Sequence, residues 1–510
     1  MDLKTVYKGL LIICVLHFGL FIQTVIAQNV LKGPYLIEPG ESSMLIRWEM
    51  DAKSDYKIAF GLSTLNTSLI KLNNRGSKHG AYLYEAELIQ LKSNSKYYYK
   101  LAGHDEHVWH SFKTSDNKQE QLRFVAMGDS RSNPEIFAKI MQQLSSVNPD
   151  FIISMGDVVE NGGNYEQWEN YFFSITEGVF ESTPIISTLG DHEGDGDDGE
   201  LFRYFLRKEE VVDKQWFSFD YGSAHFISLD YRHPENQEMI DWFIKDITSA
   251  NKKWNFVYMH RPSYNLGGHR SAWGKGIWPE LFREYNIDIV FAGHSHLYER
   301  FYPVRPKNQP SAFPVTYITT GGAGAGLYEV STNERILAKA ESVNHFIDVN
   351  IMGDTLNLTA IRMNGSLLDE FQIVKNEFGY SSDFKEMIIP QEELDMFTMF
   401  ISSISQSISS LPMYSIPATY PLHLQMTSDQ NIPFEIELDH DSKKNYFMKA
   451  VADTLKNNED KLLMLEIFSR TEMTFSSWGE MTPGLRLRLI IEYDSKQDTL
   501  YGGAINYWPE

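Results

Sequence analysis

Cysteine is nearly absent from this sequence: its 510 residues include a single one. A disulfide framework is therefore excluded as the source of stability. Positive charge is also scarce, with 46 Lys and Arg against 68 Asp and Glu and a formal net charge of −22. A surface of that sign repels polyanions, so coating of nucleic acid or of an anionic membrane is disfavoured. A small cationic or metal-lined pocket remains compatible with this charge balance.

The first 27 residues have the pattern of a secretory signal peptide. Two lysines precede an apolar run that extends to about Phe21, and small residues up to Ala27 offer a cleavage point. His17 and Gln23 interrupt the run, which makes a membrane anchor the weaker alternative. We therefore predict a protein that is periplasmic, exposed at the cell surface or secreted, with no stable membrane span after cleavage of residues 1–27. The mature chain would contain no cysteine.

The remaining chain is long enough for several domains, and its pattern changes twice. Residues 28–116 alternate polar and apolar positions in short runs separated by turn residues, which predicts an all-β sandwich. Residues 120–376 change to apolar strands alternating with helices, which predicts an α/β domain. Residues 380–510 combine a predicted helix over 445–455 with strands, and we interpret them as an α+β domain of unknown function.

Metal-binding side chains follow directly on apolar strands of the α/β region. Because ligands bind beyond the carboxyl ends of the strands in an open α/β sheet, we expect these side chains to converge. Taken singly, an Asp at a strand end is more often a turn residue or a helix cap, but the ordered set favours a metal site. Carboxylates combined with imidazoles suit Zn²⁺, Fe or Mn²⁺. The residues are Asp129, Asp157, Asp191, His192, His260, His294 and His296.

These motifs resemble those of the calcineurin-like metallophosphoesterases, and most closely the purple acid phosphatase branch. The similarity extends from about residue 30 to residue 374, and it implies a four-layer α/β metallophosphoesterase domain behind a fibronectin-III-like β sandwich. It does not cover residues 380–510. The motifs that carry it are Gly128-Asp129, Gly156-Asp157, Gly190-Asp191-His192-Glu193, His260-Arg261-Pro262 and Gly293-His294-Ser295-His296.

The resemblance implies a centre of two metal ions bridged by Asp157. His192 would lie beside the phosphate and protonate the leaving alkoxide or bind a phosphate oxygen. His269 would contact the substrate, although a solvent-exposed loop histidine is an equal alternative. The other ligands would be divided between the ions, with Asp129 and His296 on the first and Asp191, His260 and His294 on the second.

Asp191, Glu160 and Arg131 depart from the family pattern. Asp191 stands where the family usually has Asn, which adds a negative ligand to the second ion. Glu160 replaces the tyrosine of the purple branch, so no charge-transfer colour is expected from that source. Arg131 stands where the wider family often has His, and a guanidinium cannot ligate because it stays protonated. The first metal site is therefore one ligand short unless Glu160 supplies it, and Arg131 either grips a phosphate oxygen or pairs with a carboxylate.

Two further segments have ordinary interpretations. The acidic run over residues 193–200 lacks the twelve-residue spacing of a calcium loop, so we interpret it as a solvated loop at the rim of the site. The glycines of residues 321–326 lack the G-x-G-x-x-G spacing of a dinucleotide loop, and we interpret them as a close-packed turn.

We therefore expect an exported, metal-dependent phosphoesterase that resembles acid phosphatases and hydrolyses a small phosphoester by attack of metal-bound hydroxide. A monoester and a diester both remain possible, because the extra charge of Asp191 opposes a dianionic substrate whereas Arg131 favours one. The alternative from another class is an extracytoplasmic binding or adhesion protein with weak catalysis. The oligomeric state is not predicted.

Overall fold

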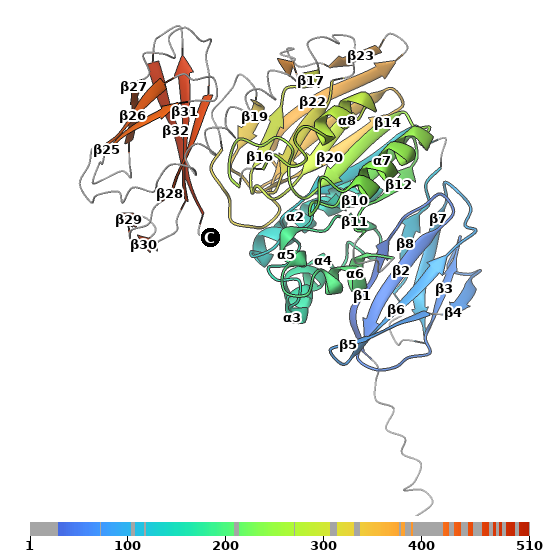
Figure 1. Cartoon of the computed structure of the whole chain (residues 1–510). Coiled ribbons are helices and arrows are strands. Elements are labelled where there is room, and N and C mark those ends of the chain that lie inside the picture. Colours follow the sequence, from blue (N-terminus) through green and yellow to red (C-terminus); the bar gives the residue numbers. More distant parts are fainter. Residues whose placement is uncertain are drawn as a thin grey trace, which may run out of the picture.

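Figure 1 shows a computed structural model of the chain. It describes residues 29–376 apart from 72, 104–107, 117–118, 209–213, 270, 306–313 and 331–336. Beyond residue 376 it describes 379–382, 389–390 and strand segments between 422 and 508. The predicted signal peptide over residues 1–27 lies outside the described residues.

Residues 30–113 form two four-stranded sheets that pack face to face around an apolar core. Strand β6 has the inward and outward alternation that the sequence pattern predicts. The core includes Ile46, Trp48, Tyr99 and Phe112. One sheet has the order β1 (Val30–Ile37), β2 (Met44–Met50), β6 (Ala81–Leu88) and β5 (Asn73–Lys78); the other has β4 (Ser68–Lys71), β3 (Lys57–Gly61), β7 (Lys96–Ala102) and β8 (His110–Lys113).

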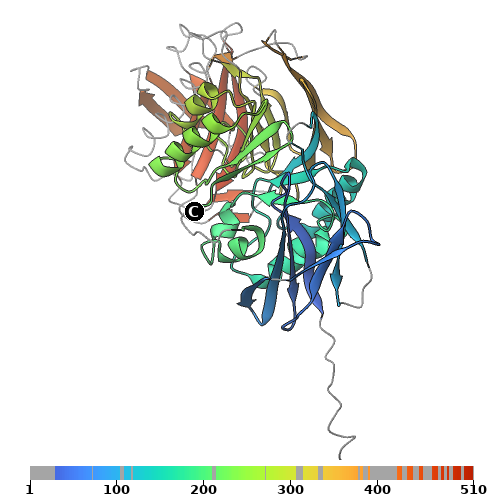
Figure 2. The same ribbon diagram turned by 90° about the vertical axis from the view of Figure 1, so that its right-hand side faces the viewer.

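This sandwich lies against helix α6 (Glu200–Leu206) of the next part of the chain, as both views show (Figures 1 and 2). Arg47 is fully buried at the contact. Its guanidinium donates to the carbonyl oxygens of Tyr204 at 3.3 Å, Phe205 at 3.0 Å and Arg207 at 2.8 Å. Those carbonyls belong to the carboxyl end of α6 and the residue after it, where helical carbonyls lack intrahelical partners. The Arg47 cation therefore joins the sandwich to α6 at the negative end of the helix dipole.

The central region consists of two seven-stranded mixed sheets, and its predicted α/β class is confirmed. Their central strands are parallel: β9 and β10 in one sheet, and β13, β14, β15 and β18 in the other. The first sheet has the order β11 (Ile185–Ser187), β10 (Phe151–Ser154), β9 (Gln121–Met127), β20 (His345–Met352), β21 (Thr355–Arg362), β22 (Leu367–Asn376), β23 (Gly379–Ser382). The second has the order β12 (Phe217–Tyr221), β13 (Ala224–Ser228), β14 (Trp254–Met259), β15 (Ile289–Ala292), β18 (Thr316–Thr320), β16 (Tyr298–Phe301), β19 (Leu337–Glu341).

Aromatic side chains fill the space between the two sheets. Phe124 of the first sheet meets Phe226, Phe256 and Phe291 of the second edge to face, with ring centroids 5.0 to 6.2 Å apart. Helices cover the outer faces, which gives the four layers (Figure 1). The first sheet carries α2 (Pro134–Val147), α3 (Tyr165–Gln167), η1 (Trp168–Phe173) and α4 (Ser174–Thr176), and the second carries α7 (Gln237–Ser249) and α8 (Trp278–Glu284).

The described residues after 380 are strands, so the predicted helix over 445–455 is wrong where it can be compared. Residues 447–451 form β27, which pairs antiparallel with β26. Pairing with β26 outweighs a weak helical propensity. The later strands are β25 (Leu422–Thr427), β26 (Pro433–Asp439), β27 (Phe447–Val451), β28 (Leu462–Phe468), β29 (Met473–Phe475), β30 (Gly479–Met481), β31 (Arg486–Asp494) and β32 (Thr499–Trp508). Strand β24 (Ile389–Pro390) pairs instead with β17 (Val304–Arg305), which lies earlier in the chain.

Within the described residues, every helix is too short or too polar to cross a bilayer.

His345 begins strand β20 as a fully buried, neutral imidazole. Its Nδ1 lies 2.8 Å from the carbonyl oxygen of Val343 and its Nε2 lies 3.0 Å from the hydroxyl of Thr320. Burial lowers its pKa to about 4. The unfolded chain binds a proton on this residue below about pH 6.5, and the folded chain does not until about pH 4.

We therefore expect the free energy of unfolding to fall by about 2–3 kcal/mol on this account as the pH drops from 6.5 to 4. Urea unfolding at intervals across that range measures the slope. In His345→Gln the part of the slope due to this residue should disappear. Equal slopes in the two proteins would contradict the assignment.

Candidate metal centre

The loops that follow the parallel strands bring the predicted ligands to one edge of the two sheets. Asp129 and His294, which are far apart in sequence, meet there: the backbone nitrogen of His294 donates to both carboxylate oxygens of Asp129 at 3.1 and 3.0 Å. Asp129, Asp157 and His294 all have positive φ, between 54° and 65°, which a side-chain-bearing residue adopts only under external constraint. Gly156 permits this close packing, because a Cβ there would lie 2.6 Å from the backbone nitrogen of Gly190.

Asp191, His260 and His294 form the first group of possible metal ligands, with ligand atoms within 4.8 Å of one another. His260 is fully buried, and its Nδ1 lies 2.8 Å from the carbonyl oxygen of Met155, to which it donates. That bond leaves a lone pair on Nε2, which has no hydrogen-bond partner. Nε2 lies 3.6 Å from Oδ2 of Asp191 and 3.5 Å from Oδ1 of Asp157. An unpartnered buried imidazole nitrogen among carboxylates fits a metal cation.

Asp129, Asp157 and His260 form a second group within the same 4.8 Å limit, so His260 lies between the two. His296 adjoins this group, with Nε2 3.5 Å from Oδ1 of Asp129. Its Nδ1 donates to the carbonyl oxygen of Gly326 at 2.6 Å, and its ring stacks on Tyr328. Gly321, Gly322 and Gly324 pack closely, as predicted for this turn, whereas Gly326 itself has open space where a Cβ would lie.

The electrostatic field at this edge favours cations. Burial alone would raise the pKa of Asp157, but the facing His260, His192 and Arg131 lower it below its ordinary value. Asp191 is shifted in the same direction, by His260 and His294. Burial disfavours a charged His260, yet the surrounding carboxylates raise its pKa to about 10. The carboxylates are thus ionised and hold a proton on Nε2 of His260, and a metal cation would replace that proton and take the lone pair.

Glu193 corrects the prediction that residues 193–200 are a solvated loop. Asp195, Asp198 and Glu200 are exposed, but Glu193 is completely buried. It lies in the short helix α5 (Asp191–Gly194), and its carboxylate accepts from the backbone nitrogens of Asp157 at 2.7 Å and Gly190 at 2.9 Å and from two further amides. Burial, followed by the charge of Asp157, raises its pKa to about 8. Glu193 therefore fixes the loops that carry two predicted ligands.

Glu193→Gln should lower the free energy of unfolding by about 2 kcal/mol, because an amide nitrogen would face backbone N–H groups that need an acceptor. Chemical denaturation at pH 9, above the raised pKa of Glu193, measures the loss. Glu200→Gln, at an exposed position nearby, is the control and should change stability by less than about 0.5 kcal/mol. Equal stability of the two variants would show that the buried carboxylate contributes little.

Arg131 has the ion-pair arrangement that was one of its two predicted roles. Its Nη1 donates to both carboxylate oxygens of Glu160, at 2.9 and 2.8 Å, and its Nε lies 3.4 Å from Oδ2 of Asp157. Glu160 is therefore engaged by a cation and by the hydroxyl of Ser132. His192 also contacts Asp157: its backbone nitrogen donates to Oδ1 at 2.9 Å, and its Nδ1 lies 2.6 Å from the carbonyl oxygen of Glu160.

Two more side chains lie at the rim of the centre. His269 is partly buried, and its ring centroid is 5.1 Å from that of His294 and 5.0 Å from that of Tyr328, so it is not a freely exposed loop histidine. Arg261, which sequence reasoning missed, forms a two-point contact with Asp191 at 3.0 and 3.1 Å. Its position directly after His260, at the end of a strand, was the available signal.

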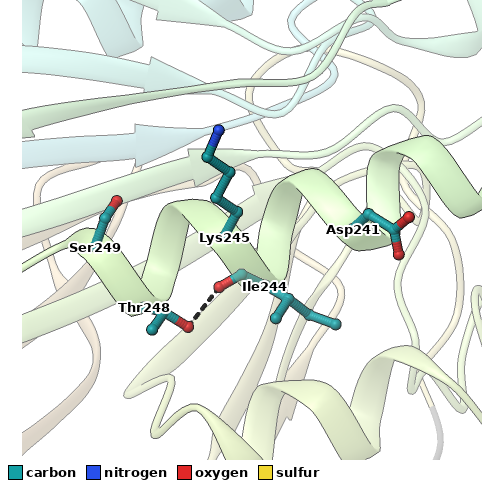
Figure 3. A pocket seen from close by; sticks show the side chains of 5 residues that line it. All are labelled: Asp241, Ile244, Lys245, Thr248 and Ser249. Carbon is teal, nitrogen blue, oxygen red and sulfur yellow. Dashed lines mark hydrogen bonds between the residues drawn. The ribbon is translucent and has the colours of Figure 1, made fainter.

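A depression of about 420 Å³ lies elsewhere, on the outer surface of α7 (Figure 3). Its lining comes from a single helix, and none of the predicted metal ligands contributes to it. It is lined by Asp241, Ile244, Lys245, Thr248 and Ser249.

Comparison with known proteins agrees with this geometry. Residues 122–298 match the calcineurin-like phosphoesterase family. Purple acid phosphatase 21 of Arabidopsis thaliana is 27% identical over 262 residues, which cover 48% of this chain and 58% of that protein. Acid phosphatase type 7 of Mus musculus is 24% identical over 342 residues, covering 57% and 76%. "Probable inactive purple acid phosphatase 27" of Arabidopsis thaliana is 23% identical, and the match covers 58% of each chain.

Among solved structures, purple acid phosphatase PPD1 from yellow lupin (Lupinus luteus) seeds superposes with a TM-score of 0.58 at 20% identity, covering 68% of this chain and 74% of that one. At that identity the likeness concerns the fold. The present chain spans 58% of the length of the two plant sequence relatives. Residues 122–298 thus belong to a calcineurin-like phosphoesterase domain, in a chain whose relatives are purple acid phosphatases.

Proposed function

We propose that this chain is an exported, metal-dependent phosphoesterase that hydrolyses a small phosphoester, in the manner of an acid phosphatase. The observation that carries the proposal is the buried, unpartnered Nε2 of His260 between the carboxylates of Asp157 and Asp191. Two such groups of ligands adjoin at one edge, as a centre for Fe, Zn or Mn ions requires. When bound there, a metal ion supplies Lewis acidity, which polarises a phosphoryl oxygen and makes a nearby water more acidic.

Hydrolysis forms a bond from a water oxygen to phosphorus and breaks the ester P–O bond, so the departing alkoxide needs a proton. His192 is suited to provide it. Its Nδ1 is fixed by the carbonyl oxygen of Glu160, which leaves Nε2 directed to the side of Asp157, 3.8 Å away. As an imidazolium it can donate from Nε2 to the leaving oxygen.

The rim residues are suited to binding the phosphate group and the rest of the substrate. Arg131, Arg261 and His269 lie beside the ligand groups, in contact with Glu160, Asp191 and His294 respectively. Guanidinium and imidazole N–H groups are donors for phosphate oxygens. Their presence at an edge rich in carboxylates supports a small anionic substrate despite the acidity of the whole chain.

The test is turnover of an aryl phosphate monoester and of the matching diester by the purified chain. We expect hydrolysis of at least one ester at mildly acidic pH, loss of activity after a strong chelator and recovery on adding Fe, Zn or Mn. The preferred ester decides between phosphatase and phosphodiesterase. Absence of turnover on both, with metal bound, would overturn the proposal.

A binding or adhesion protein with weak catalysis is the second candidate. It is favoured by the arginine at the position of a metal ligand and by a relative whose name includes "probable inactive". Metal bound without turnover of either ester would support this candidate.

Export is also part of the proposal. It rests on the charged and apolar pattern of residues 1–27. Expression of the full chain in a bacterial host, followed by N-terminal sequencing of the exported product, should give a start at Gln28. A product that retains Met1 in the cytoplasm would contradict it.

A further inference from the structure

A guanidinium stands among the side chains that resemblance assigns to the first metal ion. Arg131 places Nε 3.4 Å from Oδ2 of Asp157 and Nη2 3.4 Å from Nε2 of His296. Asp129, the third member of that set, has Oδ1 3.5 Å from the same nitrogen of His296. The guanidinium of Arg131 therefore already supplies the positive charge that a first metal ion would bring to these side chains.

The lone pairs needed for an ion at this position face N–H groups. Because His296 donates from Nδ1 to the carbonyl oxygen of Gly326, its Nε2 carries the lone pair that a metal would need. The nearest group to that lone pair is Nη2 of Arg131. A guanidinium keeps its proton at any pH that a protein survives. Arg131 therefore competes with a metal ion for these side chains and cannot itself bind the ion.

Arg131 is also held in this position. Its side chain is only 12% exposed, and Glu160 binds Nη1 through both carboxylate oxygens. Ser132 donates to the same carboxylate, which fixes the position of Glu160. This clamp makes displacement of the guanidinium by a metal ion costly, because a buried cation would have to leave the carboxylates of Glu160 and Asp157.

The other ligand group has no such competitor inside it. Nε2 of His260 is unpartnered, and Asp191 and His294 lie within reach of the same ion. Arg261 does contact Asp191, but its side chain is 45% exposed, so it can move into solvent. The two halves of the centre therefore differ in their capacity for metal.

We propose that this centre holds one metal ion, at Asp157, Asp191, His260 and His294, and that the guanidinium of Arg131 takes the place of the second ion. This inference deepens the proposed function and rests on it. Nη2, which Glu160 does not engage, would bind a phosphate oxygen where the family uses a metal. A single ion and a guanidinium together carry less positive charge than two metal ions, and this suits a substrate phosphate with one negative charge.

Metal content tests this without reference to activity. The mature full chain is stripped with a chelator, reloaded with excess Mn²⁺, passed through a desalting column, and measured by elemental analysis and by electron paramagnetic resonance. We expect about one ion per chain and the spectrum of an isolated Mn²⁺. Arg131→His, which replaces the guanidinium by a metal ligand, should bind about two ions and give the broadened spectrum of a coupled pair.

The matched control is Arg261→Ala, which removes the other arginine and should stay at about one ion. If Arg131→His does not fold, Glu160→Gln serves instead, since a weaker clamp should admit a second ion at higher Mn²⁺ concentration. A coupled pair in the wild-type chain would overturn the inference and leave the proposed function standing. One ion in every folded variant would also overturn it. A wild-type chain that binds no metal and hydrolyses neither ester would instead contradict the proposed function.

Discussion

Asp157→Asn is expected to lower kcat/KM for phosphoester hydrolysis by about a thousandfold or more. Asp157 is 2% exposed and lies between His260, His192 and Arg131. An amide keeps the shape of the side chain but removes the negative charge with which His260, His192 and Arg131 interact. Metal affinity should fall together with activity, because Asp157 belongs to one ligand group and its Oδ1 lies 3.5 Å from Nε2 of His260, which both groups share.

The measurement is steady-state hydrolysis of the better aryl ester, with metal content determined on the same samples. Asp150→Asn is the matched control. Asp150 precedes strand β10, at the opposite end from Asp157, and accepts from the backbone nitrogen of Arg123. It should leave kcat/KM within about twofold of the wild type. Near wild-type activity in Asp157→Asn would rule out its proposed role.

The positions of the candidate ligands could be predicted because they follow from local pattern. Apolar runs ending in Gly-Asp or Gly-His indicate strands with short turns, and the carboxyl ends of parallel strands meet at one edge. Asp129 and Asp157 follow neighbouring parallel strands, β9 and β10. Their separation in sequence did not matter, since the sheet sets their distance.

The contacts made by Glu193 and Arg261, and the choice between the two roles of Arg131, could not be predicted in the same way. Each depends on how two loops from different strands approach one another, and no periodicity encodes that. Glu193 is part of an acidic run in the sequence, yet a single short helix turns it inward while Asp195 points to solvent. Which carboxylate of such a run is buried can be determined only when the backbone N–H groups that donate to it are known.

Strand order was also beyond sequence patterning. Strand β20 is inserted next to β9, so the centre of the first sheet joins segments from both ends of the α/β region. The helix expected over 445–455 was wrong for a related reason. A short run such as 447–451 carries too little propensity to decide its own structure, and the neighbouring strand β26 decides it.

Arg47→Met should destabilise the chain by about 2–3 kcal/mol, the upper part of the range for losing hydrogen bonds from a buried charged group. The methionine fits the space of the stem but cannot donate. The carbonyl oxygen of Tyr204 would then lose its donor, whereas that of Phe205 keeps the hydroxyl of Tyr35 at 2.9 Å and that of Arg207 keeps Nη2 of Arg75 at 3.5 Å. The carboxylate of Glu85 would keep a cationic partner, because Arg75 also donates to it at 3.2 Å.

Urea unfolding followed by far-UV circular dichroism measures the loss, with Arg123→Met as control. Arg123 pairs with Asp348 at 2.7 Å, but its side chain is 40% exposed, so its removal should cost less than about 1 kcal/mol. Because Arg47 joins the sandwich to α6, its loss should also separate one unfolding transition into two. A single transition with the stability of the control would contradict the view that this buried cation couples the two parts.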